Sequence, residues 1–222
     1  MLPSSSSTPS PNGVLFVASD VDPVHELDYN RWYDREHVLE RVSIPGFISG
    51  TRYQAIDATK RYLGLYHTES LAVFRSPAYR QAFEQQTPWS VENLDRMREP
   101  MRRVCQVLAH TGAGQGSVLL LVQLPLGSTQ AQLEKQVLTL GAQLAEVDGF
   151  VHSCLYLPDE ALSTPLPQES TQGRVLQPIL LVHASTLAGA QQLRALALHD
   201  LVVGDDAASL YGLVWQLHAV DL

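Results

Sequence analysis

Residues 44–54 read IPGFISGTRYQ, and residues 147–157, which lie 103 positions later, read VDGFVHSCLYL. Both stretches join a turn containing Gly-Phe to a strand-like run rich in Val, Ile, Leu and Tyr. Further stretches align in the same order: VLFVASDVD (14–22) with VLLLVQLPL (118–126), YLGLYHTES (62–70) with PILLVHAST (178–186), and QVLAHTG (106–112) with WQLHAVD (215–221). This self-similarity predicts an internal repeat with one copy in each half of the chain.

Each half is predicted to follow the order β-α-β-β-α-β, because short apolar strands alternate with longer amphipathic helices. In the first half we expect strands at 14–20, 47–57, 62–68 and 103–109, with helices at 24–43 and from Ser76-Pro77 onward. In the second half we expect strands at 118–124, 150–157, 178–184 and 210–219, with helices at 129–147 and 187–201.

A β-α-β-β-α-β unit forms a four-stranded antiparallel sheet with both helices on one face, which leaves an apolar face uncovered. The second copy is the obvious cover. We therefore predict an α+β fold of tandem ferredoxin-like domains, with antiparallel sheets packed face to face as an intrachain α/β barrel. The predicted boundaries are a disordered tail (1–12), a first domain (13–112), a linker (113–117) and a second, degenerate domain (118–222).

Composition and charge exclude several function classes. The chain has 222 residues, 45% of them hydrophobic, and a net charge of −8, of which −1 falls in residues 1–112 and −7 in residues 113–222. An acidic second half argues against a nucleic-acid partner. No apolar run reaches membrane-spanning length, and the Ser/Pro-rich start lacks the features of a secretory signal. The expected location is therefore the cytoplasm, without membrane or nucleic-acid partners.

No cofactor or metal is expected from sequence motifs. Cys105 and Cys154 each lie in an apolar run and are predicted to be buried free thiols. The histidines show no spacing typical of metal ligands, although His67 aligns with His183 in the repeat, and His110 and His218 lie near matching strand ends. The Gly-rich stretch HTGAGQGS (110–117) lacks the strand–GxGxxG–helix order of a dinucleotide site.

The helix at 24–43 carries the densest polar chemistry, in the stretch NRWYDREHVLERVSIPGF (30–47). Residues four apart share a helix face, which groups Tyr33, His37 and Arg41 on one line, and Trp32, Glu36 and Glu40 on the next. A histidine whose unperturbed pKa is near 6.5 suits proton transfer, so His37 is the candidate general acid or base, with Glu36 and Arg41 beside it.

Further candidates come from the strands that this helix is expected to cover. Arg52, with Arg41, is a candidate for holding an anionic oxygen of a ligand. Tyr33, Tyr53 and Tyr66 would supply hydrogen bonds and an aromatic wall, and Trp32 would be wall or core. The competing interpretation is structural: Glu36 and Glu40 pair with arginines as surface ion pairs worth about 0.3–0.5 kcal/mol each, and the aromatic residues are core.

The combination of WYDREH at 32–37, Pro-Gly-Phe at 45–47 and Thr-Arg-Tyr at 51–53 resembles the EthD-like branch of the dimeric α/β-barrel superfamily. The stretch TKRYLGLYHTESLAVFRSPAYRQ (59–81) is similar to the same family. The resemblance covers about residues 13–111 and implies a barrel that members normally build from two chains, here fused into one. The superfamily includes monooxygenases, isomerases and haem-handling proteins, so the fold alone does not fix a reaction.

The second copy lacks the polar group. At the repeat spacing, His37 aligns with Leu140 and Arg41 with Leu144, so a site of this kind is expected once per chain.

Three functions stay open: a small-molecule binder with its cleft near His37, a cofactor-independent monooxygenase or isomerase-like enzyme acting on a small apolar substrate, and a non-catalytic structural or interaction module. The Pro-rich segment 158–177 is expected to be mobile rather than functional. A homodimer through outer surfaces also stays open.

Overall fold

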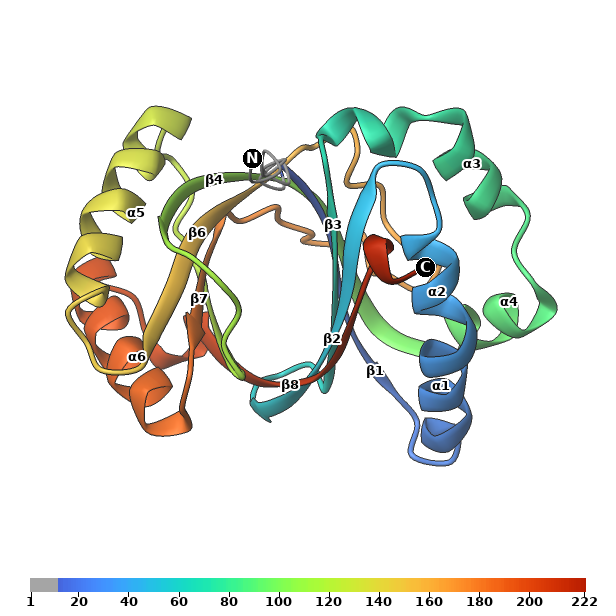
Figure 1. The fold of residues 1–222 in the computed structure, drawn as a ribbon, viewed down its shortest axis with the longest axis horizontal. Coiled ribbons are helices and arrows are strands. Elements are labelled where there is room, and N and C mark those ends of the chain that lie inside the picture. Colours follow the sequence, from blue (N-terminus) through green and yellow to red (C-terminus); the bar gives the residue numbers. More distant parts are fainter. Residues whose placement is uncertain (1–11) are drawn as a thin grey trace, which may run out of the picture.

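Eight antiparallel strands close into a barrel in the computed structural model, which describes residues 12–222 (Figure 1). The strands are β1 (Gly13–Val21), β2 (Phe47–Asp57), β3 (Tyr62–Thr68), β4 (Met97–Gly112), β5 (Val118–Gln123), β6 (Phe150–Pro158), β7 (Ile179–Ala184) and β8 (Ala208–His218). The predicted disordered tail falls almost wholly outside the described residues. The prediction of an α+β fold with an antiparallel barrel closed within one chain is confirmed.

Helices cover the outside of the barrel, in two groups on opposite sides (Figure 1). The first half supplies α1 (Glu26–Trp32), a π-helical turn η1 (Tyr33–His37), α2 (Val38–Val42), a 3-10 turn η2 (Leu71–Arg75), α3 (Pro77–Glu84) and α4 (Pro88–Asp95). The second half supplies α5 (Gln130–Leu144), α6 (Leu187–Leu201) and the 3-10 turns η3 (Asp205–Ala207) and η4 (Ala219–Asp221).

The order of strands around the barrel is the same in both halves. The first half contributes the order β4-β1-β3-β2 and the second half the order β8-β5-β7-β6. The halves meet where β2 pairs with β8 and where β4 pairs with β6, both antiparallel. The two sheets therefore join through backbone hydrogen bonds at their edges, which the prediction of two stacked sheets did not include.

Three apolar cores follow from the alternation of side chains along the strands. One core fills the barrel interior, one lies under α5 and α6, and one lies between the first group of helices and the outer face of β1–β4. The interior core includes Phe16, Leu65, Leu119, Leu181 and Tyr211. The core under the first helices is the most aromatic of the three and contains the candidate residues Trp32, Tyr33 and Tyr66.

The repeated Gly-Phe stretch has the same backbone role in both halves. Gly46, before β2, has φ +91°, and Gly149, before β6, has φ +89°. This region of backbone space suits glycine, and a Cβ at Gly46 would lie 2.6 Å from Cγ2 of Val73. The turn that opens the second strand of each half therefore requires glycine.

Most predicted elements are found within a few residues of their expected bounds. The helix expected at 24–43 is broken by the π-helical turn, and the helix expected after Ser76-Pro77 is two helices, each with a threonine or serine N-cap. Strand β4 begins at Met97, because its first residues pair with the end of β1. No helix among the described residues is long and apolar enough to cross a membrane.

The segment 158–177 packs across the outside of β4 and does not fit the expectation of a mobile loop. Glu169, which is 9% exposed, accepts hydrogen bonds from Arg103, from Arg174 and from the backbone N–H of Arg102. Ser163 exchanges hydrogen bonds with the backbone of β4. The segment comes from the second half and covers part of the first half.

Candidate functional site

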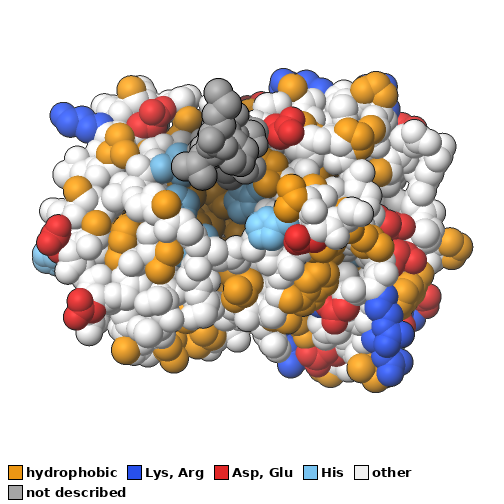
Figure 2. Space-filling view, in the orientation of Figure 1, with side chains coloured by type: hydrophobic (Ala, Val, Ile, Leu, Met, Phe, Trp, Pro, Cys, Tyr) orange, Lys and Arg blue, Asp and Glu red, His pale blue; other side chains and the backbone are white. Residues whose placement is uncertain are grey.

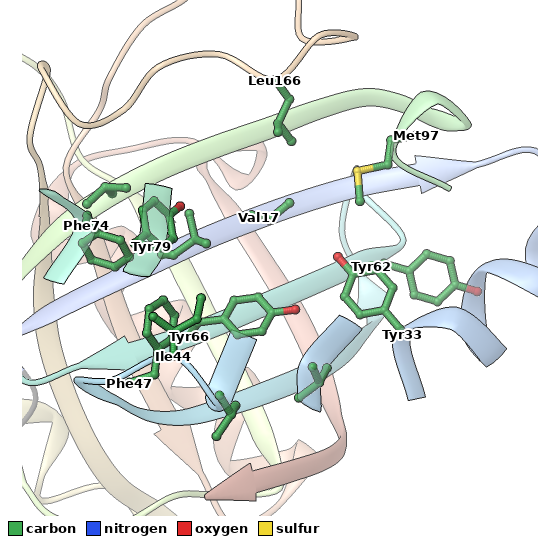
Figure 3. Close-up of a cluster of buried hydrophobic side chains, with 14 of the residues drawn as sticks. Val17, Tyr33, Ile44, Phe47, Tyr62, Tyr66, Phe74, Tyr79, Met97 and Leu166 are labelled. Carbon is green, nitrogen blue, oxygen red and sulfur yellow. The ribbon is translucent and has the colours of Figure 1, made fainter. Parts of the chain in front are cut away.

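A small cleft lies where the predicted site residues on the helix meet the outer face of the first sheet. Its volume is about 30 Å³, and it lies within the most aromatic core (Figure 3). The lining residues are Leu15, Val17, Tyr33, His37, Arg41, Tyr79, Phe83, Gln86, Leu94, Met97, Arg102 and Leu166. The cleft is thus bounded by β1, β4, the first helices and the segment between β6 and β7.

The helix presents its two polar lines as the sequence predicts. Tyr33, His37 and Arg41 all line the cleft. Trp32 and Glu36 face α4 instead, where both bond to the hydroxyl of Ser90. His37 ends the π-helical turn, and such turns occur often at functional sites. Glu36 therefore fastens α4 to the helix, and no hydrogen bond joins it to His37 among the described residues.

His37 is a neutral imidazole with an unused nitrogen. The side chain is 6% exposed, and its Nδ1 is buried without a hydrogen-bond partner in the described part of the chain. Burial, with smaller contributions from the cations Arg41 and Arg52, holds the pKa of His37 well below its ordinary value of 6.5. Its ring lies 4.2 Å from the Trp32 ring, centre to centre, which fixes the orientation of the imidazole.

Tyr66 approaches His37 from β3. The two rings are 6.0 Å apart and nearly perpendicular, and the buried Tyr66 hydroxyl has no partner among residues 12–222. The hydroxyls of Tyr33 and Tyr66 point into the same space (Figure 3). Gly50 and Gly64 leave room for this ring, since a Cβ on either would lie 3.1–3.2 Å from its carbons.

The two strand residues Arg52 and Tyr53 separate onto opposite faces of β2. Arg52 is 4% exposed, lies over the Tyr33 ring at 4.4 Å and donates to Asp34 and Asn30. Tyr53 faces the barrel interior, where Gln115 donates to its hydroxyl. Of the predicted ligand-contacting residues, Tyr53 therefore does not lie with His37.

Nine of the twelve residues that line the cleft were not predicted as site residues, and Tyr79, Arg102 and Leu166 are among them. Arg102 donates to the Tyr79 hydroxyl and to backbone carbonyls of the segment 158–177, and Leu166 of that segment closes the cleft (Figure 3). The serine and proline that begin α3 indicated a helix there, but nothing in the sequence indicated that Tyr79 would face His37. The sequence showed that the segment 158–177 is a long loop, but it did not indicate that this loop would contact the first half.

A second and much larger cavity opens at one end of the barrel. Its volume is about 520 Å³, and Figure 2 shows histidine side chains around an apolar hollow. Five of the eight histidines line it: His67, His110, His152, His183 and His218. Cys105 and Cys154 are buried free thiols, as predicted. No spacing typical of metal ligands occurs in the sequence, yet one ligand atom from each of His110, His152 and Cys154 lies within 4.8 Å of the other two.

Comparison with known proteins gives structural relatives only. No family model matches the chain, and no curated protein matches it. An anthrone oxidase-like protein of known structure shares 13% identity with a TM-score of 0.64, over 94% of this chain and 93% of its own. A Fusobacterium nucleatum protein, provisionally named a monooxygenase, shares 8% identity with a TM-score of 0.56, over 94% and 95%.

A protein from Lactobacillus acidophilus with the same provisional name shares 7% identity with a TM-score of 0.56, over 95% of this chain and 97% of its own. Identities this low show a common fold and leave the reaction open. The similarity extends over more than nine tenths of each chain, so these proteins share the overall fold described above for residues 12–222.

Proposed function

We propose that this protein binds a small, largely apolar or aromatic molecule beside His37, between the first helices and the outer face of the first sheet. The observation that carries the proposal is the unpartnered Nδ1 of the buried His37 at the wall of the cleft. A buried polar atom without a partner costs about 1–3 kcal/mol, which a ligand hydrogen bond would recover.

Arg41 supports the same proposal. It is 5% exposed, and its one hydrogen bond within residues 12–222 is a long one, 3.5 Å from Nη1 to the carbonyl of Ala82. A guanidinium has five N–H donors, so Arg41 retains donors for an oxygen of the ligand. His37 and Arg41 together suit a molecule with an apolar body and a hydroxyl, carbonyl or oxyanion.

The cleft must widen to admit such a molecule, because 30 Å³ is about the volume of one water. A neighbouring groove of about 250 Å³ shares Tyr79, Phe83 and Arg102 with it. Phe83 is 44% exposed and lies on the short helix α3. Rotation of Phe83 would join the two spaces and give a ligand its entrance.

The test uses a thermal shift with 1-naphthol and anthrone as probes. A ligand present at 100 times its Kd stabilises the folded state by about 2.7 kcal/mol, so the wild-type melting temperature should rise. The rise should disappear in His37→Phe and Arg41→Gln and remain in the matched control His199→Gln, since His199 is exposed on α6. Tyr156 lines the larger cavity inside the barrel, so a rise that survives in His37→Phe but disappears in Tyr156→Phe would place the ligand there and overturn the proposal.

A second candidate function is cofactor-independent oxygenation of the bound molecule. It is favoured by a neutral imidazole flanked by the cations Arg41 and Arg52. His37 would accept a proton from an acidic C–H or hydroxyl, and Arg41 would stabilise the resulting anion. Dioxygen would then form a C–O bond at the carbon of that anion, and loss of water from the resulting peroxide would convert a CH2 group into a carbonyl. One oxygen atom enters the product, and the other leaves as water with the two hydrogens of that carbon, so no external reductant is needed. The test measures dioxygen uptake by the protein with anthrone, and uptake should be absent in His37→Phe. Binding of anthrone without dioxygen uptake would mean that the protein binds the molecule and does not oxygenate it.

We also infer that the halves are tandem ferredoxin-like copies divided at 113–117, and that the first half is of the EthD-like type. The shared strand order and the matched glycines Gly46 and Gly149 support the duplication. Two residues of the motif at 32–37, Tyr33 and His37, line the cleft, which supports the EthD-like assignment. Because Leu140 and Leu144 are buried in the second core, the polar site would exist once per chain.

A further inference from the structure

The histidines at the barrel mouth come from several strands, and a β-bulge brings one of them inward. On β4, Val107 faces the interior, and strict alternation would bring Ala109 inward next. Between Leu108 and Thr111, β4 contains one residue more than the stretch of β6 with which it pairs, and Ala109 in this bulge has φ +52°. His110 and Gly112 therefore line the cavity instead. Bulges of this kind often redirect a side chain beside a functional site.

Three potential ligand atoms meet at this point. Nδ1 of His110 lies 3.0 Å from Nε2 of His152, and one ring nitrogen of each histidine lies within 4.8 Å of Sγ of Cys154. His152 and Cys154 are two residues apart on β6, so both face the interior. Two nitrogens bound to one tetrahedral zinc ion at about 2.0–2.1 Å would lie roughly 3.3 Å apart. The spacing in the protein is within a few tenths of an ångström of that.

We propose that the mouth of the barrel holds a divalent transition metal ion, with His110, His152 and Cys154 as its protein ligands. This site is independent of the proposed function, because it lies inside the barrel, on the opposite face of the sheet from His37. Two imidazoles and a thiolate are a ligand set that favours Zn²⁺, and three protein ligands leave a fourth position open. That position faces a cavity of about 520 Å³, which has room for a water or a small ligand.

Another histidine of the cavity lies beside the proposed ligands. His183 stacks on His152 at 5.8 Å, is 7% exposed, and has a buried Nδ1 without a partner among residues 12–222. His183 can therefore bond to a group at the open position. Cysteine binds a metal ion as the thiolate, so Cys154 would release its proton when the ion binds.

The experiment titrates the chelator-stripped protein with Co²⁺, a spectroscopic substitute for Zn²⁺, and follows visible and near-ultraviolet absorption. We expect one Co²⁺ per chain, with a thiolate-to-metal charge-transfer band and displacement by one equivalent of Zn²⁺. Cys154→Ser should remove the band, and Cys105→Ser, which changes the other buried cysteine of the barrel, should retain it. His110→Gln should weaken Zn²⁺ binding at least tenfold.

His110 is exposed, so its replacement tests the site even if Cys154→Ser fails to fold, and circular dichroism of each stripped variant checks folding. A control variant, His199→Gln, removes an exposed histidine far from the cavity and should bind as the wild type does. Absence of stoichiometric binding, a spectrum without the thiolate band, or unchanged affinity in His110→Gln would overturn the proposal. His110 and His152 would then be a hydrogen-bonded pair only.

Discussion

Nη1 of Arg103 lies 2.5 Å from Oε1 of Glu169, with side chains that are 6% and 4% exposed. Arg103 belongs to β4 in the first half, whereas Glu169 belongs to the segment between β6 and β7 in the second half. Burial alone would raise the pKa of Glu169, but hydrogen bonds from Arg174 and Arg103 bring it below its ordinary value. The other oxygen of Glu169 accepts a hydrogen bond from the backbone N–H of Leu166, which lines the His37 cleft.

Replacing Glu169 by glutamine should destabilise the protein strongly. The change leaves the buried charge of Arg103 uncompensated, and the loss of one partner of a buried pair costs about 3–5 kcal/mol. For a chain of this size that is roughly 10 °C in melting temperature, measurable by calorimetry. The control Glu160→Gln alters an exposed carboxylate of the same segment and should change stability by less than about 0.5 kcal/mol. Equal melting temperatures for the two variants would contradict this account.

The variant His37→Phe should keep or raise the melting temperature. Phenylalanine retains the ring that packs on Trp32 and removes the unpartnered Nδ1, and replacing an unsatisfied polar group by an apolar one of similar shape is nearly neutral or stabilising. Urea unfolding measures the difference. A loss above about 2 kcal/mol would mean that His37 has a structural role in the core rather than a ligand to bind.

Stability should fall as the pH is lowered from 7 to 5. The folded-state pKa of His37 is well below 6.5, so between these values the unfolded chain binds a proton that the folded chain does not. The stability that the neutral His37 contributes is therefore fully present above about pH 6.5 and is lost as the pH falls. One such histidine adds up to about 1.4 kcal/mol per pH unit. Urea titrations at several pH values should show a shallower slope for His37→Phe than for the wild type.

Gly50→Ala should destabilise the contact between α2 and the sheet. Its Cβ would lie 2.9 Å from methyl carbons of both Val38 and Val42, and β-branched side chains on a helix have little freedom to move aside. Overpacking of this kind costs about 1–3 kcal/mol. The matched control is Gly212→Ala on β8, where the new Cβ would be no closer than 3.6 Å to its neighbours. Denaturant midpoints that do not separate the two variants would contradict this prediction.

The fold was predictable because similar stretches recur in the same order in the two halves of the sequence, and because strands and helices have different periods of apolar residues. The alternation around Arg52 and Tyr53 could also have assigned these neighbours to opposite faces, since adjacent strand residues cannot both face the helix. What the sequence could not show is the path of the segment 158–177, which depends on a buried ion pair between distant residues.

The cleft beside His37 and the histidine cluster in the barrel also differ in how far the sequence could predict them. Tyr33, His37 and Arg41 lie on one helix, so their spacing alone places them together in the cleft. His110, His152 and His183 come from three strands, and one of them faces inward only because of a bulge at Ala109. A pattern that assumes regular alternation predicts the wrong face for that residue, so the cluster has no sequence signature.

Closure of the barrel has a consequence for self-association. Every strand among residues 12–222 has a hydrogen-bonded neighbour on both sides, with β2–β8 and β4–β6 completing the ring. Strand residues with a neighbour on one side only are confined to strand ends, such as residues 97–101 of β4, which pair with β1 alone. The barrel therefore offers no full-length edge for an added strand, which is the usual route to domain swapping and amyloid-like growth, and we expect self-association to use the side chains of helices and loops.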